Sequence, residues 1–173
     1  GHYFVSLPWL QDKVDLVPSN FNTCLAISNR VYHDLAKKQI LSQYSDIFHD
    51  QLAEGIIEKV PINFNNEQEI NEYTFVPHRP IIRTDDQVTT KIRAVFNCSL
   101  KTDKTAPSLN EAAFTGIDLM ASLLKLMLQF RTNDYVVISD VKKAFLMIHL
   151  DREFDKNRFT FLWKENNQLV AYR

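Results

Sequence analysis

Glycine is scarce in this chain: it occurs only three times in 173 residues, at Gly1, Gly55 and Gly116. The Walker A loop and the dinucleotide-binding fingerprint both need clustered glycines, because the backbone must approach a phosphate group closely. No such cluster exists here, so both of these phosphate-binding folds are excluded.

Composition places the chain among globular proteins of about one domain. Hydrophobic residues make up 45% and aromatic residues 12%, enough for a core. No run reaches the ~20 apolar residues that a membrane span needs, and the N-terminus shows no signal peptide. We therefore expect an intracellular protein with no membrane partner. A net charge of −1 means that any contact with nucleic acid must come from local basic patches.

The two cysteines, Cys24 and Cys98, are far apart and form no CxxC pair. Reduced thiols in the core are favoured over a disulfide. The five histidines show no zinc-ligand spacing.

Apolar residues at helical spacing over 21–54 predict two helices, broken near residues 39–42. Ser19 or Asn20 is suited to cap the first helix. Gly55 fits the C′ position that ends the second helix. A short strand is expected over 56–60.

The middle of the chain reads as strands and loops. Residues 62–72 are polar and turn-rich, and strands are expected over 73–76, 79–83 and 92–98. Residues 84–87 form a plausible turn, and 101–107 a polar loop.

The last third begins with a helix expected over 119–131, capped by Asp118. Residues 135–138, Tyr-Val-Val-Ile, form a short apolar run typical of a buried strand. A hairpin is expected from 158–163 and 169–172. This order of helices, strands, a helix and further strands predicts an α+β fold with antiparallel strands and packed helices, ending as an incomplete domain.

Asp140 follows the run 135–138 after one residue, Ser139. A carboxylate where a buried strand emerges can hold a divalent cation, as phosphoryl transfer by two metal ions requires. The alternative is that Asp140 caps the turn after the strand; position alone favours this alternative.

Lys91 and Arg93 project from one face of the expected strand, because side chains alternate along a strand. Together they could grip a triphosphate, with Arg79 and Arg83 on the preceding strand. The alternative is a solvated face balanced by Asp85 and Asp86.

Phe145 follows the carboxylate and is, on its own, most simply explained as a core residue. A ring at this place could instead exclude a 2′-hydroxyl from a bound sugar.

The order and spacing of these groups resemble reverse transcriptases of Pao/BEL-type LTR retrotransposons. Asp140, Ala144 and Phe145 match the first palm motif, Asp-x-x-x-Ala-Phe/Tyr, with a trailing leucine at Leu150. Residues 91–97, Lys-Ile-Arg-Ala-Val-Phe-Asn, resemble the fingers motif Lys-x-Arg-x-Val-x-Asp. Further matching segments are Leu7-Pro8-Trp9, the helix pair ending at Gly55 before Ile57-Glu58-Lys59-Val60, Val76-Pro77-His78-Arg79 and Ser108-Leu109-Asn110.

The resemblance implies a reverse-transcriptase-like fold with an N-terminal strap (1–17), fingers (18–117) and the start of a palm (118–173). It implies an RNA- and DNA-templated DNA polymerase that uses Mg²⁺ or Mn²⁺. The implied partners are an RNA or DNA template with primer, deoxynucleotides and the remainder of the polyprotein, in a cytoplasmic virus-like particle.

The resemblance also implies roles for individual residues. Asp140 would ligand both metal ions, helped by the Val141 carbonyl. Lys91 and Arg93 would hold the β and γ phosphates of the incoming nucleotide. Backbone amides around Lys143 and Ala144 would contact the triphosphate, and Phe145 would act as the sugar gate.

The sequence departs from the family pattern at two points. Asn97 stands where many relatives have aspartate, and no Tyr/Phe-x-Asp-Asp follows Asp140. One carboxylate of three cannot hold both ions, so the chain is expected to be inactive by itself. The alternatives are a non-catalytic nucleic-acid-binding or interaction module derived from a retroelement polymerase, and a cellular metal-dependent phosphotransferase.

Overall fold

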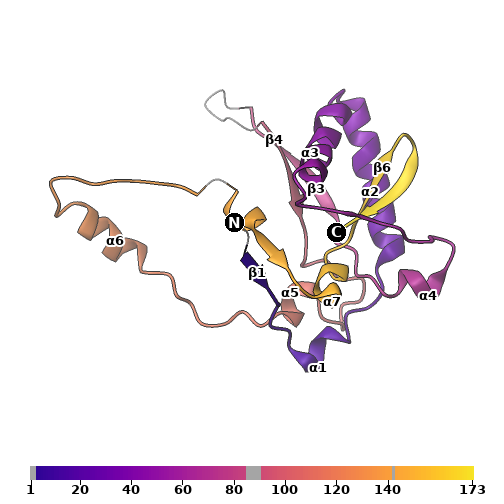
Figure 1. Cartoon of the computed structure of the whole chain (residues 1–173), viewed down its shortest axis with the longest axis horizontal. Helices are drawn as coiled ribbons and strands as arrows, with labels where there is room; N and C mark the ends of the chain where they lie inside the picture. Colours follow the sequence, from indigo (N-terminus) through magenta and orange to yellow (C-terminus); the bar gives the residue numbers. More distant parts are fainter. Residues whose placement is uncertain (1–2, 85–90, 142) are drawn as a thin grey trace.

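The computed structural model describes residues 3–84, 91–141 and 143–173. It is an α+β structure with helices packed on small sheets, as the sequence predicts (Figure 1). Antiparallel pairing joins β3 to β4 and β7 to both β2 and β6, whereas β1 and β5 pair in parallel. The elements are β1 (Tyr3–Val5), α1 (Gln11–Val14), α2 (Phe21–Lys37), α3 (Leu41–Ala53), β2 (Lys59–Val60), α4 (Glu67–Ile70), β3 (His78–Ile82), β4 (Ile92–Phe96), α5 (Leu109–Ala112), α6 (Leu123–Phe130), the 3₁₀ helix η1 (Ala144–Met147), β5 (Ile148–Leu150), α7 (Glu153–Asn157), β6 (Phe161–Glu165) and β7 (Gln168–Tyr172).

The helix pair α2 and α3 breaks where the sequence predicts, at Gln39, whose φ is +59°. Gly55 ends α3 with a φ of +68°. The amide of Gly55 donates to the carbonyl of Leu52, and the amide of Ile56 to that of Gln51. This is the Schellman pattern, which favours glycine at C′ because a left-handed φ strains other residues.

The predicted C-terminal hairpin is present as β6 and β7, although its first strand, expected over 158–163, runs over Phe161–Glu165. Its two turn residues, Asn166 and Asn167, have φ of +48° and +64°, as a two-residue type I′ turn requires. Strand β2 pairs with β7 on the other side. It covers only Lys59–Val60, so the strand expected over 56–60 is shorter than predicted.

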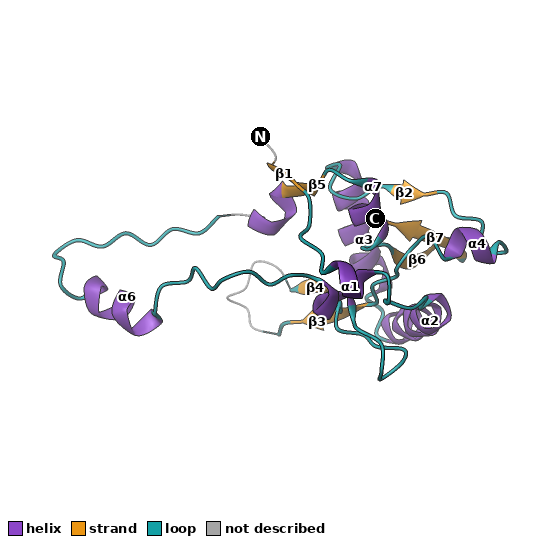
Figure 2. Ribbon diagram, turned by 90° about the horizontal axis from the view of Figure 1, so that it is seen from below, coloured by secondary structure: helices purple, strands orange, loops and turns teal. Residues whose placement is uncertain are grey.

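The helices α2 and α3 lie beside this sheet (Figure 2), and a buried aromatic cluster joins them to it. Phe48 of α3 lies at its centre and is fully buried. Its ring centroid lies 5.0 Å from that of Phe161, 5.2 Å from His78, 5.3 Å from Tyr44 and 5.5 Å from Trp163. Through His78 of β3, whose ring contacts Tyr44 and Phe48 of α3, the cluster packs the β3–β4 hairpin against the helices.

His78 is buried inside this cluster with both ring nitrogens bonded. Nε2 lies 3.1 Å from the carbonyl oxygen of Leu162, and Nδ1 lies 2.8 Å from the hydroxyl of Tyr44. Because a carbonyl only accepts, Nε2 must carry the proton, and neutral His78 accepts from Tyr44. Burial lowers the pKa of His78 from 6.5 to about 4, although the bond to Leu162 acts in the opposite direction.

This histidine is expected to make the fold sensitive to acid. The unfolded chain takes up the proton near pH 6.5 and the folded protein only near pH 4, so the stability contribution is complete above pH 6.5. This contribution to the free energy of unfolding should be lost as the pH falls from 6.5 to 4, and the loss should reach about 3 kcal/mol below pH 4. Urea denaturation at several pH values measures this loss. His78→Phe is the matched variant: it is less stable at every pH, but its stability should change less between pH 6.5 and 4. Equal pH dependence in both proteins would contradict the assignment.

The predicted N-cap position of α2 is correct, but the predicted capping hydrogen bond is absent. Asn20 occupies the N-cap position, but its side chain makes no capping bond. Its Nδ2 donates to the carbonyl of Phe75 (2.6 Å), and its Oδ1 accepts from the amide of Phe75 (2.9 Å). The expected strand 73–76 is reduced to a bridge between Phe75 and Thr160. Cys24 donates to the same carbonyl (3.2 Å), and both cysteines are free thiols.

Residues 115–141 and 143–147, which we call the arm, leave the body in an extended course and return to it (Figure 1). The helix in it is shorter than the predicted 119–131. It begins at Leu123, after Ser122 at the N-cap position. Asp118 does not cap it, because its carboxylate accepts from the amide of Met120 in a local turn (2.9 Å).

Candidate functional site

The β3–β4 hairpin has one face toward the core and one toward solvent. On β4, Ile92 and Ala94 pack against the aromatic cluster, whereas Arg93 is exposed and lies opposite Ile81 of β3. Lys91, just before β4, is also exposed. Arg93 points to solvent as the predicted alternation requires, whereas Lys91 lies just outside the strand. That the two share one face and hold phosphates stays a prediction.

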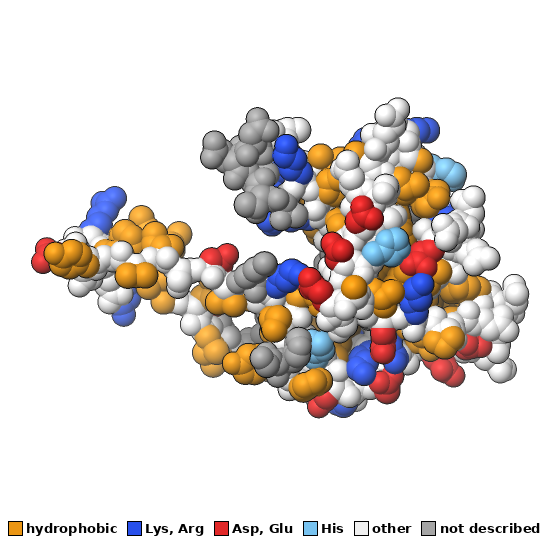
Figure 3. All heavy atoms as spheres, turned by 45° about the horizontal axis from the view of Figure 1, so that its top comes forward, with side chains coloured by type: hydrophobic (Ala, Val, Ile, Leu, Met, Phe, Trp, Pro, Cys, Tyr) orange, Lys and Arg blue, Asp and Glu red, His pale blue; other side chains and the backbone are white. Residues whose placement is uncertain are grey.

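Two more cations, Arg79 and Arg83, extend this surface. Figure 3 shows basic side chains gathered near the end of the hairpin. Arg79 lies opposite Val95 on the same strand pair, and Arg83 follows β3 and donates its amide to the carbonyl of Lys91 (2.8 Å). Asp85 and Asp86, the acidic residues expected to balance this face, lie outside the described residues. Among residues the structure does describe, no carboxylate pairs with Arg79, Arg83 or Arg93.

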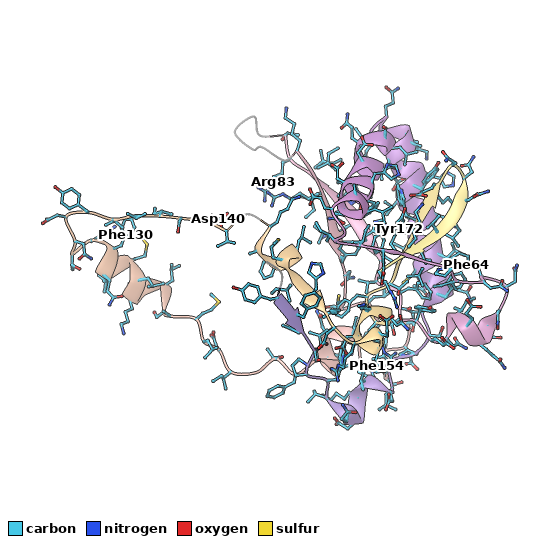
Figure 4. All side chains as sticks on the ribbon, in the orientation of Figure 1. Phe64, Arg83, Phe130, Asp140, Phe154 and Tyr172 are labelled. Atoms are coloured by element: carbon cyan, nitrogen blue, oxygen red, sulfur yellow. The ribbon has the colours of Figure 1, made fainter. Side chains whose placement is uncertain are left out.

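Asp140 lies on the stretch of the arm that leads from α6 back to the body (Figure 4). The run before it is not the buried strand that its composition predicts. Tyr135 is 93% exposed and Val137 89%, and no described strand pairs with either. A strand is held by hydrogen bonds to a neighbour, so without one the run stays extended and solvated. Asp140 is consequently an exposed carboxylate rather than one held at a sheet edge.

The residues after Asp140 turn back onto the body. Val141 is exposed, and Lys142, within the motif, lies outside the described residues. Lys143 has a φ of +56°, and its Nζ lies 2.7 Å from Oε1 of Glu54, which ties the end of the arm to the end of α3. Ala144 then opens the 3₁₀ helix η1.

Phe145 is 89% exposed, so the alternative that it is a core residue is wrong. It lies at a cavity of about 460 Å³ between η1, β5, β4 and the C-terminus. Phe96 of β4 lines the same cavity, with Phe161 and Arg173. The cavity joins segments more than 40 positions apart, and no pattern in the sequence signals it.

The described residues do not complete a metal site. None of their histidine, cysteine, aspartate and glutamate side chains form a group of three or more that could hold an ion. Mg²⁺ and Mn²⁺ take several oxygen ligands, and the Asp140 carboxylate with the Val141 carbonyl would supply too few. The expected cation therefore does not fit the residues seen here without further ligands.

In the described part of the chain, no helix is both long and apolar enough to cross a membrane. No protein-family model, curated protein or solved structure matches the chain. The site consists of a cationic hairpin face and an arm that carries an exposed carboxylate and an exposed aromatic ring.

Proposed function

We propose that this chain is the N-terminal portion of an RNA-directed DNA polymerase, namely the fingers and first palm segment of a retrotransposon reverse transcriptase. The observation that carries the proposal is the β3–β4 hairpin, where Lys91 and Arg93 face solvent while Ile92 and Ala94 face the core. A rigid strand pair with two outward cations suits a triphosphate, because Arg binds in a bidentate manner and Lys as a point charge.

The cavity places Phe145 near the hairpin, but on its core side. Phe96, three residues after Arg93, and Phe145 line the same 460 Å³ space. Phe96 lies on the face of β4 that carries Ile92 and Ala94, opposite to the face of Arg93, because side chains alternate along a strand. The sugar-gate role of Phe145 and the contact of amides near Lys143 and Ala144 with the phosphates are therefore part of the proposal and are not supported by the cavity.

Catalysis would require ligands beyond those described. In such polymerases two divalent ions hold the attacking and leaving oxygens. Asp140 would supply one carboxylate, and the others would come from elsewhere in the polyprotein. The isolated chain should therefore show no Mg²⁺-dependent primer extension, and measurable extension would contradict this expectation.

The exposed arm is consistent with a chain that works inside a larger assembly. Many large apolar side chains on it face solvent, including Leu119, Leu123 and Val137 at more than 70% exposure (Figure 3). Apolar surfaces of this extent commonly mark interfaces. Under the proposal the arm packs on the remainder of the polyprotein, and the whole works in a cytoplasmic virus-like particle with template, primer and deoxynucleotides.

The sugar-gate role of Phe145 tests the proposal directly. In a polymerase that contains this chain, Phe145→Val should raise the efficiency of ribonucleotide over deoxynucleotide incorporation by about tenfold or more, because the smaller side chain leaves room for the 2′-hydroxyl. Single-nucleotide extension with each nucleotide measures the ratio. Phe154→Val, which shortens a 43% exposed ring on α7, is the control and should leave the ratio unchanged. An unchanged ratio in Phe145→Val would remove the gate assignment.

One observation favours a second candidate, a non-catalytic nucleic-acid-binding module. The described residues hold a cationic face but no group of acidic side chains able to bind a metal. The two candidates separate in one experiment on the full-length protein. Binding of primer–template together with extension supports the polymerase, and binding without extension at any Mg²⁺ or Mn²⁺ concentration supports the module.

A further inference from the structure

The N-terminal residues 3–10 lie across both ends of the arm (Figure 1). From here on the strap means residues 3–10, the part of the expected strap 1–17 that makes these contacts. Residues 112–114 are the first foot of the arm, and residues 148–151 are its second foot. The strap touches the second foot with its first half and the first foot with its second half. Positions far apart in sequence are thus held by one short segment.

At the second foot, β1 pairs in parallel with β5, with Tyr3 opposite Ile148 and Val5 opposite Leu150. The amide of Asp151 donates to the carbonyl of Val5 (3.2 Å), and the hydroxyl of Ser6 donates to the Asp151 carboxylate (2.7 Å). Within the described strands, β1 is the sole partner of β5. The second foot therefore depends on the strap for its backbone pairing.

At the first foot, the contacts are again between backbones. The amide of Leu10 donates to the carbonyl of Ala112 (2.8 Å), and the amide of Phe114 donates to the carbonyl of Pro8 (2.8 Å). These bonds flank the bridge between Trp9 and Ala113. The strap thus pairs with both feet through main-chain hydrogen bonds.

Asp155 of α7 anchors the strap between its two feet. Its side chain is fully buried and accepts from Nε1 of Trp9 (2.6 Å) and from the amide of Leu7 (2.9 Å). Arg152 donates to the same carboxylate and to the carbonyl of Leu7 (2.7 Å). Burial acts to raise the pKa of Asp155, but the bonds from Trp9, Leu7 and Arg152 outweigh it, so the pKa is lowered and the acceptor stays charged.

We propose that the strap fixes the two feet of the arm, and that Asp155 and Trp9 are positioning residues for Asp140 and Phe145, which the arm carries. The strap contacts one foot with the residues before its bonds to Asp155 and the other foot with the residues after them. Weakening the bonds to Asp155 should therefore loosen both feet together. The segment Leu7-Pro8-Trp9 matched the family pattern in sequence, but no role was predicted for it. No sequence pattern pointed to Asp155. The statement about Asp140 and Phe145 rests on the proposed function, whereas the statement about the feet does not.

Hydrogen exchange of the amides in the two feet tests the strap in this chain. Trp9→Phe keeps a ring against Phe159 but removes the Nε1 donor. Exchange in both feet should rise by about tenfold or more, the factor expected from losing one hydrogen bond to a charged acceptor. The matched control is Trp163→Phe, which removes the other tryptophan and its bond to Ser45 (3.3 Å). It should leave exchange in the feet unchanged.

Two further variants keep the test decisive. Asp155→Asn should loosen both feet, and Ser6→Ala, which removes one exposed bond to Asp151, should loosen the second foot alone. Unchanged exchange in the feet of Trp9→Phe would overturn the proposal. So would a rise that is equally large in β6 and β7, because that is a general loss of stability.

The positioning of Asp140 is tested separately, in a polymerase that contains this chain. Trp9→Phe should lower kcat for deoxynucleotide incorporation while KM stays within about twofold, because among the described residues the hydrogen bonds of the strap go to the feet, α1 and α7 and not to β3 or β4. A released foot with unchanged kcat would overturn the positioning role. If the unaltered protein has no polymerase activity, the proposed function fails, and hydrogen exchange still decides whether the strap holds the feet.

Discussion

Replacing Asp140 by asparagine in a polymerase that contains this chain is expected to abolish primer extension while template binding stays close to that of the unaltered protein. Asparagine keeps the size of the side chain but loses the negative charge that a divalent cation needs as ligand. Loss of such charge stabilisation in a reaction of this class should lower kcat by a factor of about 10³ or more. Extension of a labelled primer measures the rate, and a filter-binding titration measures template affinity.

Asp134→Asn is the matched control, because Asp134 is an exposed carboxylate on the same arm, six positions before Asp140. It should leave both measurements unchanged. Equal loss of extension and template binding in Asp140→Asn would identify a structural carboxylate instead, as the turn-cap alternative holds. Retained extension would remove Asp140 from the metal site altogether.

Phe48→Ala is expected to lower the free energy of unfolding by about 3–5 kcal/mol, the usual cost of removing a buried phenylalanine ring. Phe48 is fully buried and contacts rings from α3, β3, β6 and β7. The cavity left behind would loosen the packing around His78, through which the β3–β4 hairpin is joined to the helices. Urea denaturation followed by far-ultraviolet circular dichroism measures the change.

Phe154→Ala is the comparison, since the Phe154 ring on α7 is 43% exposed and lies under the Arg158 guanidinium group, 4.7 Å from its ring centroid. It should cost less than about 1.5 kcal/mol. A loss as small as this in Phe48→Ala would mean that the aromatic cluster is not packed as the structure places it. In that case the link between the hairpin and the core would need another basis.

Local structure followed the sequence wherever neighbouring residues decide it. Gly55 ends α3 and Asn166-Asn167 turns the last hairpin, because both positions require left-handed backbone that these residues accept. The break between α2 and α3 lies where the helical spacing of apolar residues fails. The outward direction of Arg93 likewise follows from the period of two along a strand.

Patterns that depend on a distant partner were misinterpreted. The run 135–138 has the composition of a buried strand, yet it is exposed because no described strand lies beside it. Asn20 has the chemistry of a helix cap, yet its amide group is bonded to Phe75, 55 positions away. When a polar side chain can bond either a neighbouring or a distant backbone group, the sequence alone does not show which partner it takes.

The sequence by itself determined the α+β class, the helix pair, the final hairpin and the scarcity of glycine that excludes two phosphate-binding folds. Each of these depends on propensity or periodicity over a few neighbouring residues. Only the tertiary structure decided that Asp140 is exposed, that Phe145 meets Phe96 at one cavity, and that Asp155 anchors the strap. These features depend on which segments far apart in sequence pack against each other. The contacts that determine this packing are spread over the whole chain.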